Sequence, residues 1–232
     1  MLHVDRHDQR YHFQNDWLSA YWHFSFDHYY DPARVSFGPL RVFNDDTIRP
    51  RSGFPMHPHR DMEIVTILLS GTLEHEDNQG NRGLVEAEEV QVMSAGTGIV
   101  HAERNPSPTV PVHLLQIWIQ PARPGGRPRW AQAPFPHDAS LGPLVALASG
   151  EERPGALRIG QAATIYRVRL GAGEAVTHDL GPRRRAYLFT IGGAATAAGH
   201  ALESGDAARV EDETGIELKG TRSADLLLLD LP

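Results

Sequence analysis

The sequence contains no cysteine among its 232 residues. This absence excludes disulfide bonds, zinc sites with thiolate ligands and catalysis by a cysteine nucleophile. A bound metal must therefore be held by nitrogen and oxygen ligands. A chain without cysteine is also typical of the cytoplasm, which is the location that we expect.

Long hydrophobic runs and an excess of positive charge are missing as well. No run of about 18 apolar residues is present, so we expect no membrane span. Residues 1–14 are too polar for a secretion signal. The formal net charge of −7 argues against binding to nucleic acid. The sequence predicts a soluble protein without membrane or nucleic-acid partners.

Short segments rich in β-branched and aromatic residues dominate the chain. They lie between residues that favour turns, and examples are 63–69, 112–119 and 186–191. They recur at about ten-residue spacing, which favours a sandwich or a barrel. The sequence therefore predicts an all-β fold.

The chain divides into two related halves. Prolines, two adjacent glycines and three arginines crowd residues 121–136, which favours a connection there. Glu86–Ile99 can be aligned without gaps on Glu203–Ile216, and both segments end in Thr-Gly-Ile. A repeat of this kind predicts two copies of one barrel. We expect a first barrel at 1–122, a linker at 123–143 and a second barrel at 144–232.

Two histidine-containing segments of the first half predict a metal site. His57 and His59 alternate along a strand and so share a face, as do His101 and Glu103. Two such strands facing each other would bring three imidazoles and a carboxylate together. Glu63 has the same parity as His59, so on spacing alone the fourth ligand is either Glu63 or Glu103. This donor set suits Fe(II), and also Mn, Co, Ni, Cu or Zn.

The second half lacks these residues. At the positions of His101 and Glu103 it has Leu218 and Gly220. The positions of His57 and His59 fall on Asp179 and Gly181. We expect a second barrel without a metal, with a structural role.

The two segments also resemble the signature motifs of a known family. The sequence Gly-Phe-Pro-Met-His-Pro-His-Arg at 53–60 and the sequence Ala-Gly-Thr-Gly-Ile-Val-His-Ala-Glu at 95–103 are similar to those of pirins, members of the cupin superfamily. The resemblance is strong over about 40–121 and weaker beyond, as in bacterial pirin-like proteins with quercetinase activity. One departure is Ala87-Glu88-Glu89, where pirins usually have Pro-Gly-Asp; it is a turn away from the expected ligands.

The resemblance implies a fold and a metal centre. Pirins are bicupins, with two tandem double-stranded β-helix (jelly-roll) barrels. Their pattern assigns one metal, usually iron, to His57, His59, His101 and Glu103. It then leaves Glu63 as a residue that orients a ligand imidazole, or as an alternative ligand.

The activity implied is that of a quercetin 2,3-dioxygenase (flavonol 2,4-dioxygenase), which opens the flavonol ring with O2 and releases CO. Glu103 would accept the proton of the flavonol hydroxyl. Phe54, Met56 and Trp118 are candidates to line the substrate pocket. The alternative is a redox-sensing, metal-dependent regulatory protein that binds a protein partner. We expect a monomer, because two barrels can cover each other.

Overall fold

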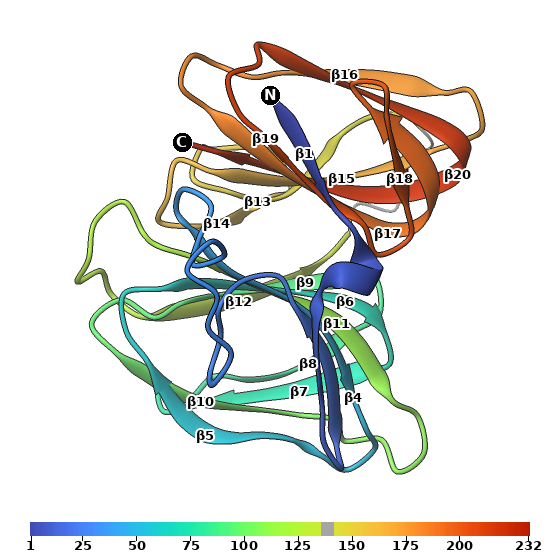
Figure 1. The fold of residues 1–232 in the computed structure, drawn as a ribbon. Helices are drawn as coiled ribbons and strands as arrows, with labels where there is room; N and C mark the ends of the chain where they lie inside the picture. The colour runs from blue at the N-terminus through green and yellow to red at the C-terminus, as the bar shows by residue number, and fades with distance from the viewer. Residues whose placement is uncertain (136–141) are drawn as a thin grey trace. The chain divides into compact units, whose positions relative to one another are not determined.

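Nearly all of the regular structure is β-strand (Figure 1). The computed structural model describes residues 1–135 and 142–232, and in these ranges the one helix is a single 3-10 turn, His7–Gln9. The prediction of an all-β protein is confirmed, and the three strand segments predicted above all lie within observed strands. Within the same ranges, no helix has the length and apolar character needed to cross a bilayer.

The chain forms two compact units. The N-terminal unit consists of Tyr11–Phe135 and Leu157–Gln161. The C-terminal unit consists of Met1–Arg10, Ala162–Pro232 and the described part of Pro136–Ala156. Each unit therefore includes a short segment from outside its main stretch of sequence.

The N-terminal unit has two antiparallel sheets, with strand orders β12-β9-β6-β11-β4-β3-β2 and β5-β10-β7-β8. The strands of the larger sheet are β2 (Tyr11–Gln14), β3 (Leu18–Trp22), β4 (Leu40–Ile48), β6 (Glu63–Ser70), β9 (Glu89–Ser94), β11 (Val112–Ile119) and β12 (Arg129–Pro134). Those of the smaller sheet are β5 (Gly53–His59), β7 (Thr72–Asp77), β8 (Arg82–Glu86) and β10 (Ile99–Arg104). The two-residue strand β14 (Leu157–Arg158) lies against β9 and β12.

The C-terminal unit is built on one antiparallel path, β1-β19-β17-β20-β15-β13, with β16 paired to β20 and β18 paired to β17. Its strands are β1 (Leu2–Asp5), β13 (Val145–Ser149), β15 (Thr164–Leu170), β16 (Ala175–Asp179), β17 (Arg185–Ala197), β18 (His200–Glu203), β19 (Ala207–Val210) and β20 (Gly215–Leu231). The long strands β17 and β20 shift register twice along their pairing. Such bulges bend a strand, which lets both strands take part in curved sheet.

The boundaries of the units differ from the predicted ones at two places. Residues 1–10 were expected in the first barrel, but β1 pairs with β19, and Arg209 binds Asp5. The stretch 123–143 was expected to be a linker, yet it contains β12, which pairs with β9. Prolines are tolerated there because β12 is an edge strand, where one side needs no hydrogen-bond donors. Residues 136–141 of that expected linker lie outside the described residues.

The core of each unit follows the two-residue period of its strands. In the N-terminal unit, Leu18 and Leu114 of the larger sheet pack with Leu73 of the smaller one. In the C-terminal unit, Leu188, Leu218 and others form a larger apolar cluster. Burial of one such leucine contributes about 1.5–3 kcal/mol to stability. The two sheets of the N-terminal unit therefore hold their inner faces together, and these faces position the site.

Candidate metal centre

The two histidine strands are paired directly. β5 and β10 are antiparallel neighbours, with His101 opposite His57 and Ile99 opposite His59. The pairing shifts register between His101 and Glu103. At that point a Cβ at Gly53 would overlap the backbone oxygen of Glu103, so only glycine allows the strands to approach this closely.

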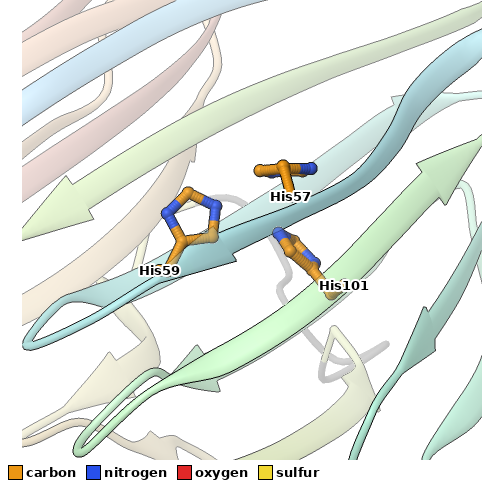
Figure 2. A group of neighbouring side chains, drawn as sticks. All are labelled: His57, His59 and His101. Carbon is orange, nitrogen blue, oxygen red and sulfur yellow. The ribbon is translucent and has the colours of Figure 1, made fainter.

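Three imidazoles meet at this pairing, as Figure 2 shows for His57, His59 and His101. Each offers a nitrogen within 4.8 Å of the others. The ring centroids are 4.4 Å apart for His57 and His101, 4.7 Å for His57 and His59, and 5.0 Å for His59 and His101. The three rings are therefore close enough to bind one cation together.

The hydrogen bonds of these imidazoles leave nitrogens free for a ligand. His57 Nδ1 donates to the carbonyl oxygen of Pro55 over 2.7 Å, which leaves Nε2 as the nitrogen with a lone pair. Nε2 of His59 and both ring nitrogens of His101 are buried without a hydrogen-bond partner. Buried polar atoms left unpaired cost about 1–3 kcal/mol each. A metal ion would satisfy these nitrogens, so the residues present fit such a group.

The pKa values of His59 and His101 also favour metal binding. Burial, helped by the neighbouring imidazoles, lowers the pKa of His59 from 6.5 to about 3 and that of His101 also to about 3. Both rings are therefore neutral at neutral pH. Protons do not compete with a metal for their lone pairs under that condition.

Glu103 lies beside His101 and is held from behind. Its side chain is buried, and Oε1 accepts a hydrogen bond from Gln91 Nε2 at 2.6 Å, while Oε2 accepts one from Gln116 Nε2 at 2.8 Å. Thr66 joins the two amides, since its Oγ1 donates to Gln116 and accepts from Gln91. The carboxylate is thus fixed in orientation by uncharged donors.

His75 is a residue of this site that the sequence analysis missed. It forms a second group of possible ligands with His101 and Glu103. Its Nε2 lies 3.2 Å from Asp77 Oδ2, both side chains are fully buried, and its ring stacks on Trp130 at 5.0 Å. In the sequence His75 stands among acidic residues, a pattern that suggests a strand face exposed to solvent. Only the alternation of Leu73, His75 and Asp77 on one face of β7 could have indicated burial.

A cavity of about 370 Å³ opens beside the imidazoles, between the two sheets of the N-terminal unit. Phe54 and Trp118 line it, together with the aromatic side chains of Trp22 and Phe26. Met56, the third predicted lining residue, does not line it and is 47% exposed. It is one position from His57 on β5 and so points to the opposite face.

One amide and one acidic side chain of β4 also line this cavity. Asn44 and Asp46 are almost fully buried, and Oδ1 of each has no hydrogen-bond partner. Burial raises the pKa of Asp46 well above its usual range, and the charges of Asp45 and Glu103 act in the same direction. Nothing in the sequence distinguished these residues from the other polar residues of the strand.

Glu63 is not at this centre, contrary to the expectation that it orients or replaces a ligand. It accepts a hydrogen bond from Ser94 Oγ at 2.6 Å, lies 3.9 Å from Arg129 and lines a separate cavity. The parity argument failed because β5 ends at His59, and a turn with Asp61 at φ 49° leads into β6 of the other sheet. Alternation holds only within one strand.

Comparisons with known proteins find relatives that match nearly the whole chain. The family model described as Pirin matches residues 4–119, and that described as Quercetinase C-terminal cupin domain matches residues 146–231. The chain is 41% identical over 232 residues to a protein of Escherichia coli K12 named quercetin 2,3-dioxygenase, covering 100% of this chain and 99% of that one. It is 45% identical over 215 residues to a pirin-like protein of Caulobacter vibrioides, covering 92% of each.

Among solved structures, the fold matches the nickel(II) complex of the bacterial pirin YhhW from Escherichia coli. The TM-score is 0.95 at 39% identity, covering 100% of this chain and 99% of that one. A relative thus binds a divalent metal on the same fold.

Proposed function

The chain belongs to the pirin family of bicupins, and on that premise we propose that it is a metal-dependent dioxygenase that acts on flavonols. The predictions of this family and of an all-β bicupin fold are confirmed. The observation that carries the proposal is the group of three imidazoles, with unpartnered nitrogens, at the wall of an aromatic cavity. The relatives named quercetin 2,3-dioxygenase support a flavonol as the substrate.

One divalent metal would be held by His57, His59 and His101, with Glu103 as the fourth ligand. Three imidazole nitrogens and a carboxylate suit the first-row metals from Mn to Zn. We propose Fe(II), because pirins usually hold iron. Nickel is an alternative that the YhhW complex supports.

The residues of the site have separable roles in this reaction. A divalent cation at the imidazoles would supply Lewis acidity that lowers the pKa of the flavonol 3-hydroxyl. Glu103 would accept the proton of that hydroxyl, in the orientation that Gln91 and Gln116 give its two oxygens. Phe54 and Trp118 would hold the flat rings and exclude water. Dioxygen would then add across C2 and C4 of the heterocyclic ring, both of its oxygen atoms would remain in the ring-opened ester, and C3 would leave with its own oxygen as carbon monoxide.

Turnover of quercetin by protein loaded with each metal in turn tests the proposal. We expect oxygen uptake and carbon monoxide release with at least one metal, and loss of both in Glu103→Gln, which keeps the size of the side chain. Tight metal binding without turnover of any flavonol would reject the dioxygenase. That result would instead support the metal-dependent regulatory protein.

A further inference from the structure

The wall of the cavity formed by β4 carries two polar side chains that the proposed reaction does not use. Asn44 and Asp46 alternate on one face of this strand and are 3% and 2% exposed. Both line the cavity that holds His57, His59 and His101. They face the same space as the imidazoles but belong to the other sheet.

Their hydrogen bonding differs from that of the polar residues beside them. Gln116, the cross-strand partner of Asn44, is bonded to Glu103 and Thr66, and Gln91 is bonded to the same two residues. In contrast, Oδ1 of Asn44 and Oδ1 of Asp46 are buried with no partner. Within the described part of the chain, no hydrogen bond is found for either side chain. Buried acceptors of this kind are rare unless a bound molecule satisfies them.

The free atoms match a particular ligand chemistry. Both orphaned atoms are oxygen acceptors, and a hydroxyl group is a donor that a planar phenol presents at its edge. The aromatic side chains of Trp22, Phe26 and Trp118 supply apolar walls for flat rings beside these acceptors. The cavity therefore combines apolar faces with hydrogen-bond acceptors placed away from the imidazoles.

Resting on the proposed function, we propose that Asn44 and Asp46 accept hydrogen bonds from flavonol hydroxyl groups other than the 3-hydroxyl, and so select polyhydroxylated flavonols. A site built to bond a hydroxyl discriminates strongly against the analogue that lacks it, because its own polar groups are then left unpaired. The two residues are specificity determinants and take no part in the proton transfer to Glu103.

The test compares quercetin with 3-hydroxyflavone, which keeps only the hydroxyl that the metal would bind. For the metal-loaded wild type we expect kcat/KM to be higher for quercetin by about a hundredfold. In Asn44→Leu and in Asp46→Leu this ratio falls about tenfold or more. The matched control is Thr47→Val on the same strand, whose side chain points to the opposite face and does not line the cavity. The control leaves the ratio unchanged.

Two further measurements separate this role from a structural one. Thermal unfolding without ligand should show Asn44→Leu and Asp46→Leu at least as stable as the wild type, since each removes an unpaired buried polar atom. Anaerobic binding, followed by tryptophan fluorescence, should show the same loss of preference for quercetin as turnover does.

The outcomes distinguish this inference from the proposed function. A wild type that turns over flavonols, with variants whose ratio is unchanged, overturns the inference alone and leaves ordered water as the partner of these atoms. A wild type without turnover rejects the dioxygenase. In that case, a lack of any preference for quercetin in anaerobic binding overturns the inference as well.

Discussion

The pair of strands that carries the histidines in the N-terminal unit has an apolar counterpart in the C-terminal unit. In the N-terminal unit β10 pairs with β5, and His101 lies opposite His57. In the C-terminal unit β20 pairs with β16, and Leu218, which occupies the repeat position of His101, lies opposite Val176. Leu218 is fully buried in the apolar cluster of its unit. Both groups of possible metal ligands found in the described residues belong to the N-terminal unit.

This difference shows what the barrel itself needs. The C-terminal unit has the aliphatic pair Leu218 and Val176 at this place, so a barrel of this kind does not need a histidine there. The histidines of the N-terminal unit leave buried nitrogens unpaired and so cost stability. Residues that destabilise a fold and converge on one point are typical of a functional site.

The largest effect is expected when His101 of the N-terminal unit is replaced by leucine, the residue at its repeat position in the C-terminal unit. His101→Leu should abolish metal binding. It should also raise the activation free energy of flavonol turnover by several kcal/mol, which lowers the rate about a thousandfold or more. Metal content after dialysis and oxygen uptake measure the two effects. The control His200→Ala removes an exposed histidine of the C-terminal unit and should change neither. Full metal content in His101→Leu would contradict the proposed ligand set.

The buried imidazoles should also make the metal-free protein sensitive to acid. Their pKa values are about 3 in the folded state against 6.5 for an unperturbed histidine, so between these values the unfolded chain binds more protons. The part of the free energy of unfolding that depends on these two imidazoles is therefore fully present above pH 6.5, and it is lost as the pH drops toward 3. From pH 7 to pH 5 we expect a loss of up to about 2 kcal/mol for each imidazole. Urea unfolding of chelator-treated protein measures this, and His101→Leu should show a smaller loss; an equal loss would contradict the assignment.

A smaller effect is expected from the amides behind Glu103. Gln91→Leu removes a hydrogen bond to Oε1 and should lower metal affinity or turnover about tenfold, because partners behind a ligand typically contribute that much. Metal titration and steady-state kinetics measure it. Gln14→Leu, an exposed glutamine of β2, is the control. If both variants behave alike, the orientation of Glu103 does not depend on Gln91.

The smallest effect is expected at Glu63. Glu63→Gln should change turnover by no more than about twofold, because independent sites contribute separately and this carboxylate binds Ser94 in another cavity. Steady-state kinetics with quercetin measures it. A loss comparable to that of Glu103→Gln would restore Glu63 to the metal centre.

The sequence predicted the strands and the convergence of His57, His59 and His101 because alternation within a strand is a local property. It could not place Glu63, whose position depends on a turn between two sheets. In the second half, counting back from the shared glycine predicted Asp179 at the repeat position of His57, whereas the residue paired with Leu218 in the structure is Val176. His75, Asn44 and Asp46 were missed for a related reason, since burial of a polar residue depends on the partner sheet.

The first strand of the chain has a consequence for how the protein is made and cut. β1 completes the sheet of the C-terminal unit, and its Asp5 binds Arg209, 204 positions along the chain. During synthesis this strand leaves the ribosome before the N-terminal unit, but its neighbour β19 emerges only after that whole unit. A contact between such distant positions is slow to form. A fragment that begins after residue 135 would therefore expose the edge of β19, and a separable C-terminal unit needs residues 1–10 grafted back onto it.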